Sequence, residues 1–167
     1  DEEPNRTAAA LFRFLLATGT RRNEALTARW DDIDLGQRQW RLPTSKNGRS
    51  RFVQLNDTAV KVLVGQMAVT NGEWVFPARG GRPGHLGDPK KAFARVLQRA
   101  GILDFRIHDL RHAYASMIVQ SGLSLQVAQS LLGHRHQATT ARYAHLAPAQ
   151  LQEAAGRVAE VIEGAVR

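Results

Sequence analysis

The stretch from His108 to Leu146, HDLRHAYASMIVQSGLSLQVAQSLLGHRHQATTARYAHL, decides the fold of this chain. Its apolar periodicity predicts a first helix that Gly122 is placed to end. The residues expected on one face of that helix are Leu110, Tyr114, Met117 and Ile118. Ser124 is a suitable N-cap for a second helix, which Gly133 would end, and a short third helix is expected from near Thr139.

Four polar side chains of this stretch fall at the ends of the predicted helices or on the last of them. His108 and Arg111 occupy the first turn of the first helix, and His134 lies just past the second. Tyr143 is carried by the third. Groups of different chemistry at element ends are suited to converge on one site.

Three short motifs follow one another in this stretch. They are H-x-L-R-H at residues 108–112, L-G-H at residues 132–134 and T-x-x-Y at residues 140–143. In this order and spacing they resemble the C-terminal catalytic domain of tyrosine recombinases of the phage-integrase type. The resemblance implies the fold of the DNA breaking-rejoining enzymes.

Two further segments match the pattern of that family. The resemblance implies that Gly19-Thr20-Arg21-Arg22-Asn23-Glu24 carries the first catalytic arginine, Arg21, with Glu24 as a supporting partner. Residues 38–55 alternate apolar and polar side chains on both sides of Asn47-Gly48 and predict a β-hairpin. Lys46, just before that turn, would be a solvated surface residue on structural grounds alone. The resemblance implies a catalytic lysine here, and we favour that interpretation.

The resemblance therefore implies a set of six catalytic residues. They are Arg21, Lys46, His108, Arg111, His134 and Tyr143. It further implies attack of the tyrosine on a DNA phosphodiester, a 3′-phosphotyrosyl intermediate, and rejoining to a different strand. No metal or nucleotide cofactor is expected.

Composition agrees with a DNA-binding protein. The 167 residues suit one domain over 1–167, and they carry a net charge of +8 with an isoelectric point near 11.0. Such a balance favours a polyanionic partner, here double-stranded DNA. Cysteine is absent, and no apolar run approaches the length of a membrane span. We expect a cytoplasmic, nucleoid-associated protein without a membrane partner.

The rest of the chain predicts an α+β fold, mostly helical, with one small antiparallel sheet. Further helices are expected from a cap at Asn5 or Thr7, through Leu16, to a stop at Gly19, over residues 58–68, and from Pro89 to Gly101 with Asp88 as N-cap. Residues 1–4 are predicted to fray, a short helix to end at Trp30, residues 74–76 to be extended, and residues 78–87 to form a loop.

A last amphipathic helix is expected at about residues 148–165. It would dock on its own domain or be exchanged with a partner, since the resemblance implies a homo-oligomer, a tetramer on paired DNA sites. Recombinases of this type usually carry an N-terminal core-binding domain, and nothing in these 167 residues corresponds to it.

Other interpretations remain open. His108 and His112 have the four-residue spacing of zinc ligands, but Asp109 replaces the required glutamate and Arg111 lies between them, so we expect His112 to be a packed structural residue. His85 is assigned to the surface, without a partner. Alternatives to a recombinase are a type IB topoisomerase, a non-catalytic DNA-binding remnant of a mobile element, and a helix-turn-helix regulator.

Overall fold

The computed structural model describes residues 3–43 and 50–133 of the chain. The chain divides into two compact units, residues 1–114 and 115–167. Its elements in order are α1 (Arg6–Thr18), α2 (Arg22–Leu26), η1 (Trp30–Asp32), β1 (Ile33–Asp34), β2 (Gln39–Leu42), β3 (Arg51–Gln54), α3 (Asp57–Met67), η2 (Arg79–Gly81), α4 (Lys90–Ala100), α5 (Asp109–Gln120) and α6 (Leu125–Leu132). The predicted class, mostly helical with one small antiparallel sheet, is confirmed.

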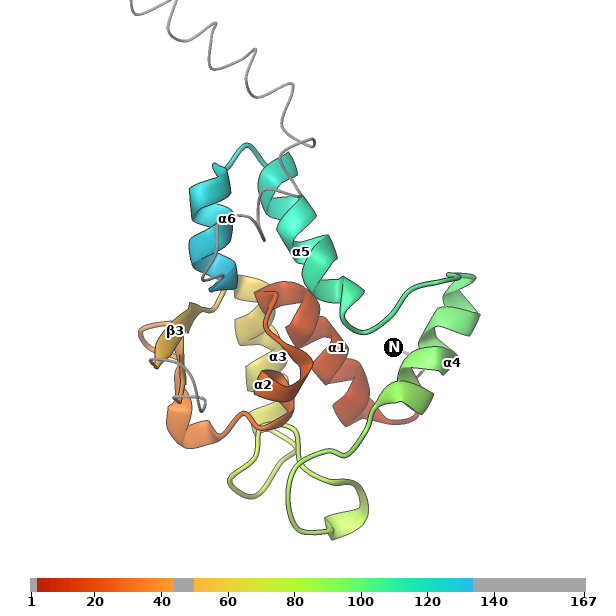
Figure 1. Ribbon diagram of the computed structural model, residues 1–167. Helices are drawn as coiled ribbons and strands as arrows, with labels where there is room; N and C mark the ends of the chain where they lie inside the picture. The colour runs from red at the N-terminus through yellow and green to blue at the C-terminus, as the bar shows by residue number, and fades with distance from the viewer. Residues whose placement is uncertain (1–2, 44–49, 134–167) are drawn as a thin grey trace, which may run out of the picture. The chain divides into compact units, whose positions relative to one another are not determined.

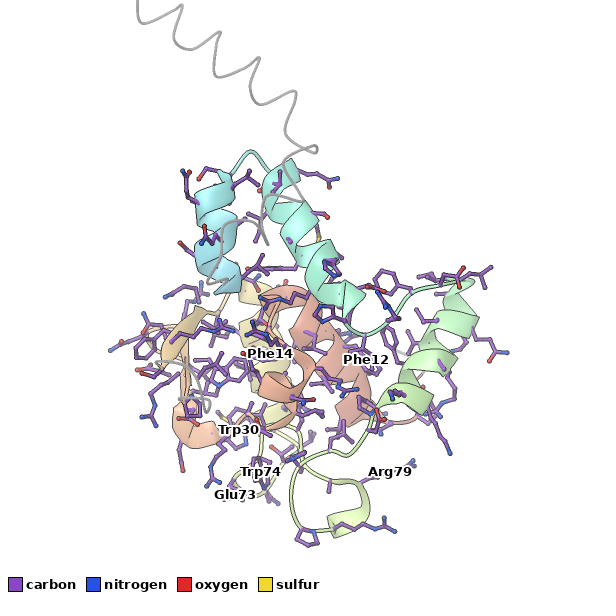
Figure 2. All side chains as sticks on the ribbon, in the orientation of Figure 1. Phe12, Phe14, Trp30, Glu73, Trp74 and Arg79 are labelled. Atoms are coloured by element: carbon purple, nitrogen blue, oxygen red, sulfur yellow. The ribbon has the colours of Figure 1, made fainter. Side chains whose placement is uncertain are left out.

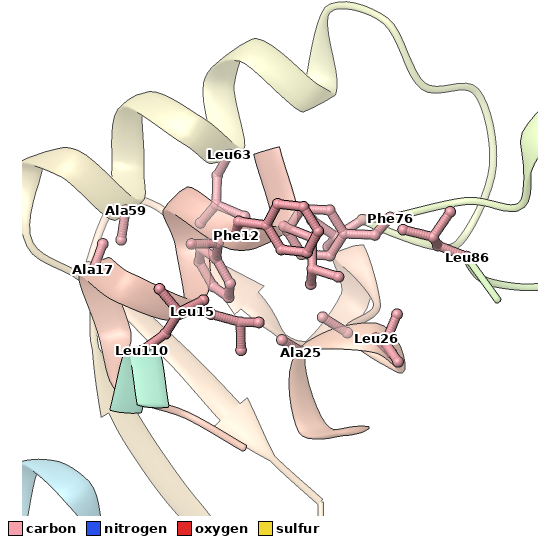
Figure 3. Close-up of a cluster of buried hydrophobic side chains, with 14 of the residues drawn as sticks. Phe12, Leu15, Ala17, Ala25, Leu26, Ala59, Leu63, Phe76, Leu86 and Leu110 are labelled. Atoms are coloured by element: carbon pink, nitrogen blue, oxygen red, sulfur yellow. The ribbon is translucent and has the colours of Figure 1, made fainter. Parts of the chain in front are cut away.

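Helix α1 is the centre of the first unit and lies between α3 and α4 (Figure 1). It begins where predicted, because the Asn5 side chain accepts a hydrogen bond of 3.1 Å from the backbone of Ala8. Its apolar residues point into a core shared with α3, the sheet and the segment around Phe76 (Figure 3). Phe14 is fully buried, with its ring centroid 5.4 Å from Trp40 and 5.5 Å from Phe76. Each such side chain stabilises the fold by about 1.5–3 kcal/mol.

The predicted hairpin is present as the antiparallel pair β2 and β3, and β1 extends it to three strands in the order β1-β2-β3. Trp40 pairs with Val53, and both side chains are buried against the core. Leu42 is buried as well, so the predicted alternation in β2 is confirmed. The Asn47-Gly48 turn lies outside the described residues.

The N-terminal segment does not fray at Glu3, and this prediction was wrong. The Glu3 carboxylate is buried and accepts hydrogen bonds from Arg95 and Arg99 of α4, at 3.1 Å from Nε of Arg95 and 3.3 Å from Arg99. The hydrogen bonds from Arg95, opposed by burial, hold the pKa of Glu3 below its usual value. A long-range ion pair, which residues 1–4 alone do not reveal, therefore fixes the start of the unit onto α4.

The segment after α3 is held against residues 28–30. Arg29 forms an ion pair of 2.6 Å with Glu73 and lies over the ring of Trp74, 5.1 Å from its centroid. Figure 2 shows Trp30, Glu73 and Trp74 gathered in this region. His85 packs edge-on against Trp74 at 5.3 Å, and its Nδ1 lies 2.8 Å from the carbonyl oxygen of Leu86, so assigning His85 to a surface without partners was wrong.

Several predicted boundaries shift by a few residues. Helix α2 ends at Leu26, and Trp30 instead begins η1. Helix α4 begins at Lys90 and its N-cap is Pro89, one residue later than the predicted cap, although the Asp88 side chain still accepts from the backbone N–H of Lys90 at 3.2 Å. Helix α3 begins and ends one residue earlier than predicted. Met117 was expected on the apolar face of α5 but is 46% exposed.

The second unit contains the end of α5 from Ala115 and helix α6. Ser124 caps α6 as predicted, accepting from the backbone of Val127 at 3.3 Å. Gly133 ends the helix in the left-handed conformation, also as predicted. The helix expected near Thr139 and the one at about residues 148–165 lie outside the described residues. No helix in the described part of the chain is long and apolar enough to cross a membrane.

Candidate active site

The site is built on the turn that joins α1 to α2. Helix α1 ends at Gly19, whose φ of 61° is left-handed and whose N–H donates to the carbonyl of Leu15 at 2.9 Å. The buried hydroxyls of Thr18 and Thr20 share a hydrogen bond of 2.9 Å across it. Two residues after the glycine, Arg21 stands at the start of α2 with 54% of its side chain exposed. The turn is thus fixed from inside while its arginine faces outward.

Glu24 fixes Arg21 from the first turn of α2. Its carboxylate accepts the backbone N–H of Arg21 at 2.8 Å and the guanidinium of Arg21 at 3.0 Å. The guanidinium of Arg51, at the start of β3, donates to the same carboxylate at 2.9 Å. Burial opposes ionisation, but the Arg21 backbone N–H and the charges of Arg51 and Arg21 hold the pKa of Glu24 below its usual value. Glu24 is therefore the partner expected for Arg21, and it also ties the turn to the strand after the hairpin loop.

Arg111 reaches the same turn from α5. Its side chain is buried, and its Nη1 donates to the carbonyl oxygen of Gly19 at 2.5 Å. The two predicted arginines, 90 residues apart in the sequence, thus act from one turn, Arg21 as a member of it and Arg111 bound to it. Two arginines from separate sequence motifs therefore lie at the same turn.

His108 lies at the entry to α5, one turn before His112, and its side chain reaches solvent. The ring of His112 lies edge-on to it with centroids 5.0 Å apart. Partial desolvation, followed by the positive neighbours His112 and Arg111, holds the pKa of His108 below its usual value. A neutral imidazole at this position is able to accept a proton at neutral pH.

A cleft of about 610 Å³ opens beside Arg21 and His108. Its lining carries three further basic side chains, Arg22, Lys90 and Arg106, here called with Arg21 the basic lining of the cleft. The apolar lining consists of Phe93, Ala94, Leu97, Phe105 and Ile107. The basic lining suits contact with an anionic backbone beside the predicted catalytic residues Arg21 and His108.

Three of the six predicted catalytic residues are placed by the structure, and three are not. Arg21, His108 and Arg111 lie at or beside one turn, as described above. Lys46, His134 and Tyr143 lie outside the described residues. Among residues 3–43 and 50–133, no group of three or more His, Cys, Asp or Glu side chains is arranged to hold a metal ion.

Sequence reasoning missed two parts of the site. Gly19 was predicted only as a helix stop, yet it is also the docking point of Arg111. Tyr114 was predicted only as a core residue, yet its ring lies directly against Gly19. The sequence signal for this part of the site was a glycine two residues before Arg21. Nothing local in the sequence indicates which side chain packs on that glycine.

Comparisons with known proteins identify the family. The family model described as "Phage integrase family" matches residues 2–150. The integrase of Salmonella phage P22 is 36% identical over 162 residues, which cover 89% of this chain and 42% of that protein. The tyrosine recombinase XerD of Rhizobium meliloti (strain 1021) is 33% identical over 155 residues, covering 86% of this chain and 49% of that one. The chain thus spans about half the length of these relatives.

Solved structures agree with these relatives. The catalytic domain of bacteriophage HP1 integrase superposes with a TM-score of 0.69 at 26% identity, covering 93% of this chain and 84% of that one. The XerH recombinase in its post-cleavage complex with a palindromic difH substrate gives a TM-score of 0.70 at 26% identity, covering 92% of this chain and 45% of that one. The fold is that of tyrosine recombinase catalytic domains, and the chain belongs to the phage integrase family.

Proposed function

We propose that this chain is the catalytic domain of a site-specific DNA recombinase that cuts and rejoins strands through Tyr143. The observation that carries the proposal is the docking of Arg111 on the carbonyl of Gly19, two residues before Arg21. Two guanidiniums acting from one turn are suited to the two non-bridging oxygens of a single phosphate. Membership of the phage integrase family supports Tyr143, in the T-x-x-Y motif, as the nucleophile.

The reaction is an in-line phosphoryl transfer. The Tyr143 hydroxyl oxygen bonds to phosphorus while the bond from phosphorus to the 5′ oxygen breaks, which leaves a 3′-phosphotyrosyl linkage. Arg21 and Arg111 stabilise the charge that grows on the non-bridging oxygens, and His134 donates to one of them. A 5′ hydroxyl of another strand then reverses the steps. Because the linkage retains the energy of the phosphodiester, rejoining needs no nucleotide or metal cofactor.

Proton transfer accompanies both bond changes. His108 accepts the proton of the tyrosine hydroxyl, and Lys46 gives a proton to the departing 5′ oxygen. The lowered pKa of His108 keeps its imidazole neutral at pH 7 and so supports its role as acceptor. A phenol has an ordinary pKa of about 10, so it needs both this acceptor and the positive charge around it.

The substrate is double-stranded DNA. The XerH relative is a recombinase bound to its difH substrate, and it shares the fold of this chain. The basic lining of the cleft, with Arg22, Lys90 and Arg106, supports contacts to phosphates that flank the scissile one. Exchange between two sites requires four subunits, so we propose a homotetramer on paired DNA, acting in the nucleoid of the cytoplasm.

The segment after Pro148 would couple these subunits. Its amphipathic pattern suits a helix that docks on a neighbour when DNA is bound, so that unpaired subunits do not cut. A chain ending at Pro148 is then expected to bind one site as before but to lose cooperative binding to paired sites.

A nicked substrate that traps the covalent intermediate tests the proposed function. The nick lets the short fragment that carries the new 5′ hydroxyl diffuse away after cleavage, so the protein stays attached to DNA and migrates slowly on a denaturing gel. A recombinase should form this adduct and also exchange strands between two sites. An adduct together with relaxation of supercoils but without exchange would indicate a topoisomerase, and binding without any adduct would indicate a non-catalytic remnant.

A further inference from the structure

The end of α1 is closed by an aromatic ring. A methyl group built on Gly19 would lie 2.2 Å from Cδ1 of Tyr114 and 2.9 Å from both Cε1 and Cγ. Real Cβ atoms essentially never approach another heavy atom so closely, so the ring or the backbone would have to shift. The glycine is therefore required by the ring as well as by its left-handed φ of 61°.

The same glycine is held a second time from the same helix. Arg111 and Tyr114 are three residues apart on α5, a spacing that puts both on one face. Arg111 donates to the Gly19 carbonyl at 2.5 Å, while the ring of Tyr114 covers the α-carbon. One turn of α5 thus contacts Gly19 twice, through a hydrogen bond to its carbonyl and through an aromatic ring on its α-carbon.

Hydrogen bonds of the two neighbouring threonines link the position of Gly19 to that of Arg21. The Thr18 and Thr20 hydroxyls, both buried, bond each other at 2.9 Å on either side of Gly19, and Thr18 also donates to the carbonyl of Phe14 at 2.8 Å. A shift of Gly19 away from α5 would therefore move Arg21 relative to Arg111.

The requirement is specific to this glycine. Gly101 ends α4 in the same left-handed conformation, with φ of 64°, and a methyl group there would meet nothing within 4 Å. Gly19 and Gly101 therefore share the backbone strain of a substitution but not its steric consequence. Burial raises the pKa of Tyr114, which keeps its hydroxyl neutral and agrees with a packing role for the ring.

We propose that Tyr114 and Gly19 form a contact, here called the Tyr114 lock, that sets the position of Arg111 relative to Arg21. Tyr114 is a positioning residue, and the proposal rests on the proposed function in that the two arginines act on one phosphate. A ring packed on the glycine is not needed to end a helix, because Gly101 ends α4 with no atom within 4 Å of the position that its Cβ would take.

The test compares Gly19→Ala with Gly101→Ala in adduct formation at saturating DNA, with folding checked by circular dichroism and DNA affinity measured separately. Gly19→Ala should slow the adduct by about 100-fold, the usual cost of a misplaced catalytic group. Gly101→Ala should slow it by less than about threefold, since it carries only backbone strain.

A second pair of variants keeps the test sharp if Gly19→Ala is poorly folded. Tyr114→Ala should slow the reaction by about tenfold, and adding Gly19→Ala to it should cost less than about threefold more, because the space vacated by the ring accepts the methyl group. Tyr114→Phe keeps the ring and should recover most of the rate that Tyr114→Ala loses.

A substrate with one non-bridging oxygen replaced by an uncharged methyl group separates positioning from folding. This substrate lacks a charge that the arginines must stabilise. The ratio of the parent's rate of adduct formation to that of Gly19→Ala should therefore be about tenfold smaller on it than on normal DNA. Three results would overturn the Tyr114 lock without affecting the proposed function. They are an unchanged rate ratio on this substrate, equal rate losses for Gly19→Ala and Gly101→Ala, and fully additive losses in the Tyr114→Ala/Gly19→Ala double variant. A parent chain that never forms the adduct would overturn the proposed function and the lock with it.

Discussion

Helices α1 and α4 end in the same way and serve different purposes. Each ends in a left-handed glycine, Gly19 with φ of 61° and Gly101 with φ of 64°. The first is followed by Arg21 and is held by Arg111 and Tyr114. After the second come Ile102 and Leu103, 47% and 86% exposed, and the space around the glycine is open.

The comparison shows that a local motif fixes how a helix ends but not what the end is for. Both glycines satisfy the last carbonyls of a helix, which is a property of the backbone alone. The α1 end becomes a candidate catalytic element only because α5, about 90 residues later, packs onto it. The following experiments probe the α1 end and the residues tied to it, with matched positions elsewhere as controls.

Apart from removal of the nucleophile itself, the largest effect is expected at Lys46, which precedes β3, the strand tied to the α1 end through Glu24 and Arg51. Lys46→Ala should slow cleavage by about 10²–10⁴, the usual contribution of a general acid. A substrate whose departing 5′ oxygen is replaced by sulfur should restore much of that rate, because sulfur leaves without a proton. Rescue of Arg21→Ala to the same extent, with none for Lys46→Ala, would assign the proton to another group.

Sequence reasoning recovered the elements that depend on local signals. Asn5 and Ser124 as N-caps, Gly19 and Gly133 as helix ends, and the β2–β3 pair all follow from rules that act within a few residues. Family motifs then selected Arg21, His108 and Arg111, which the structure places at or beside one turn.

The sequence could not reveal contacts made across the fold. The burial of Glu3 depends on two arginines more than 90 residues away, and the exposure of Met117 depends on what packs beside α5. The ring of Tyr114 against Gly19 is of the same kind. Apolar spacing identified a face of α5, but it does not say what that face meets.

The next largest effect on adduct formation is expected at Arg111, which binds the α1 end, and Arg99 at the α4 end is its control. Arg111→Lys keeps the charge but loses the fork that binds the Gly19 carbonyl and, in the proposed reaction, a phosphate oxygen, so adduct formation should fall by about 10²–10³. Arg99→Lys, in the last turn of α4, alters only the ion pair with Glu3 and should leave the rate within about threefold. Similar losses in the two variants would remove the distinction between the two helix ends.

Glu24 is expected to have an intermediate effect. Glu24→Gln weakens the hold on Arg21 and Arg51 and should slow the adduct by about 10- to 100-fold. Its lowered pKa means that the stability it contributes is present above its ordinary value of 4.5 and is lost as the pH falls through the folded value. The difference in melting temperature between parent and Glu24→Gln should therefore shrink on acidification below pH 4.5. Glu73→Gln, in an exposed pair with Arg29, is the control, and an equal effect there would contradict the role of Glu24.

The smallest effect is expected at the other end of α4, where Lys90 lines the cleft. If Lys90 contacts one phosphate, Lys90→Gln should weaken DNA binding by about threefold and lower the slope of log affinity against log salt by about 0.9. Lys61→Gln, an exposed lysine on α3 outside the cleft, should leave the slope unchanged. Equal slopes for the two variants would exclude a phosphate contact at Lys90.

The central claim is that Tyr143 is the nucleophile while Tyr114, the chain's other tyrosine, serves the α1 end. The most direct test is adduct formation on nicked DNA by Tyr143→Phe and Tyr114→Phe, each of which removes one hydroxyl and no positive charge. Tyr143→Phe should form no adduct while binding DNA within about threefold of the parent. Tyr114→Phe should still form it, because the ring that contacts Gly19 is kept. An adduct that survives Tyr143→Phe, or one that disappears with Tyr114→Phe alone, would contradict the account.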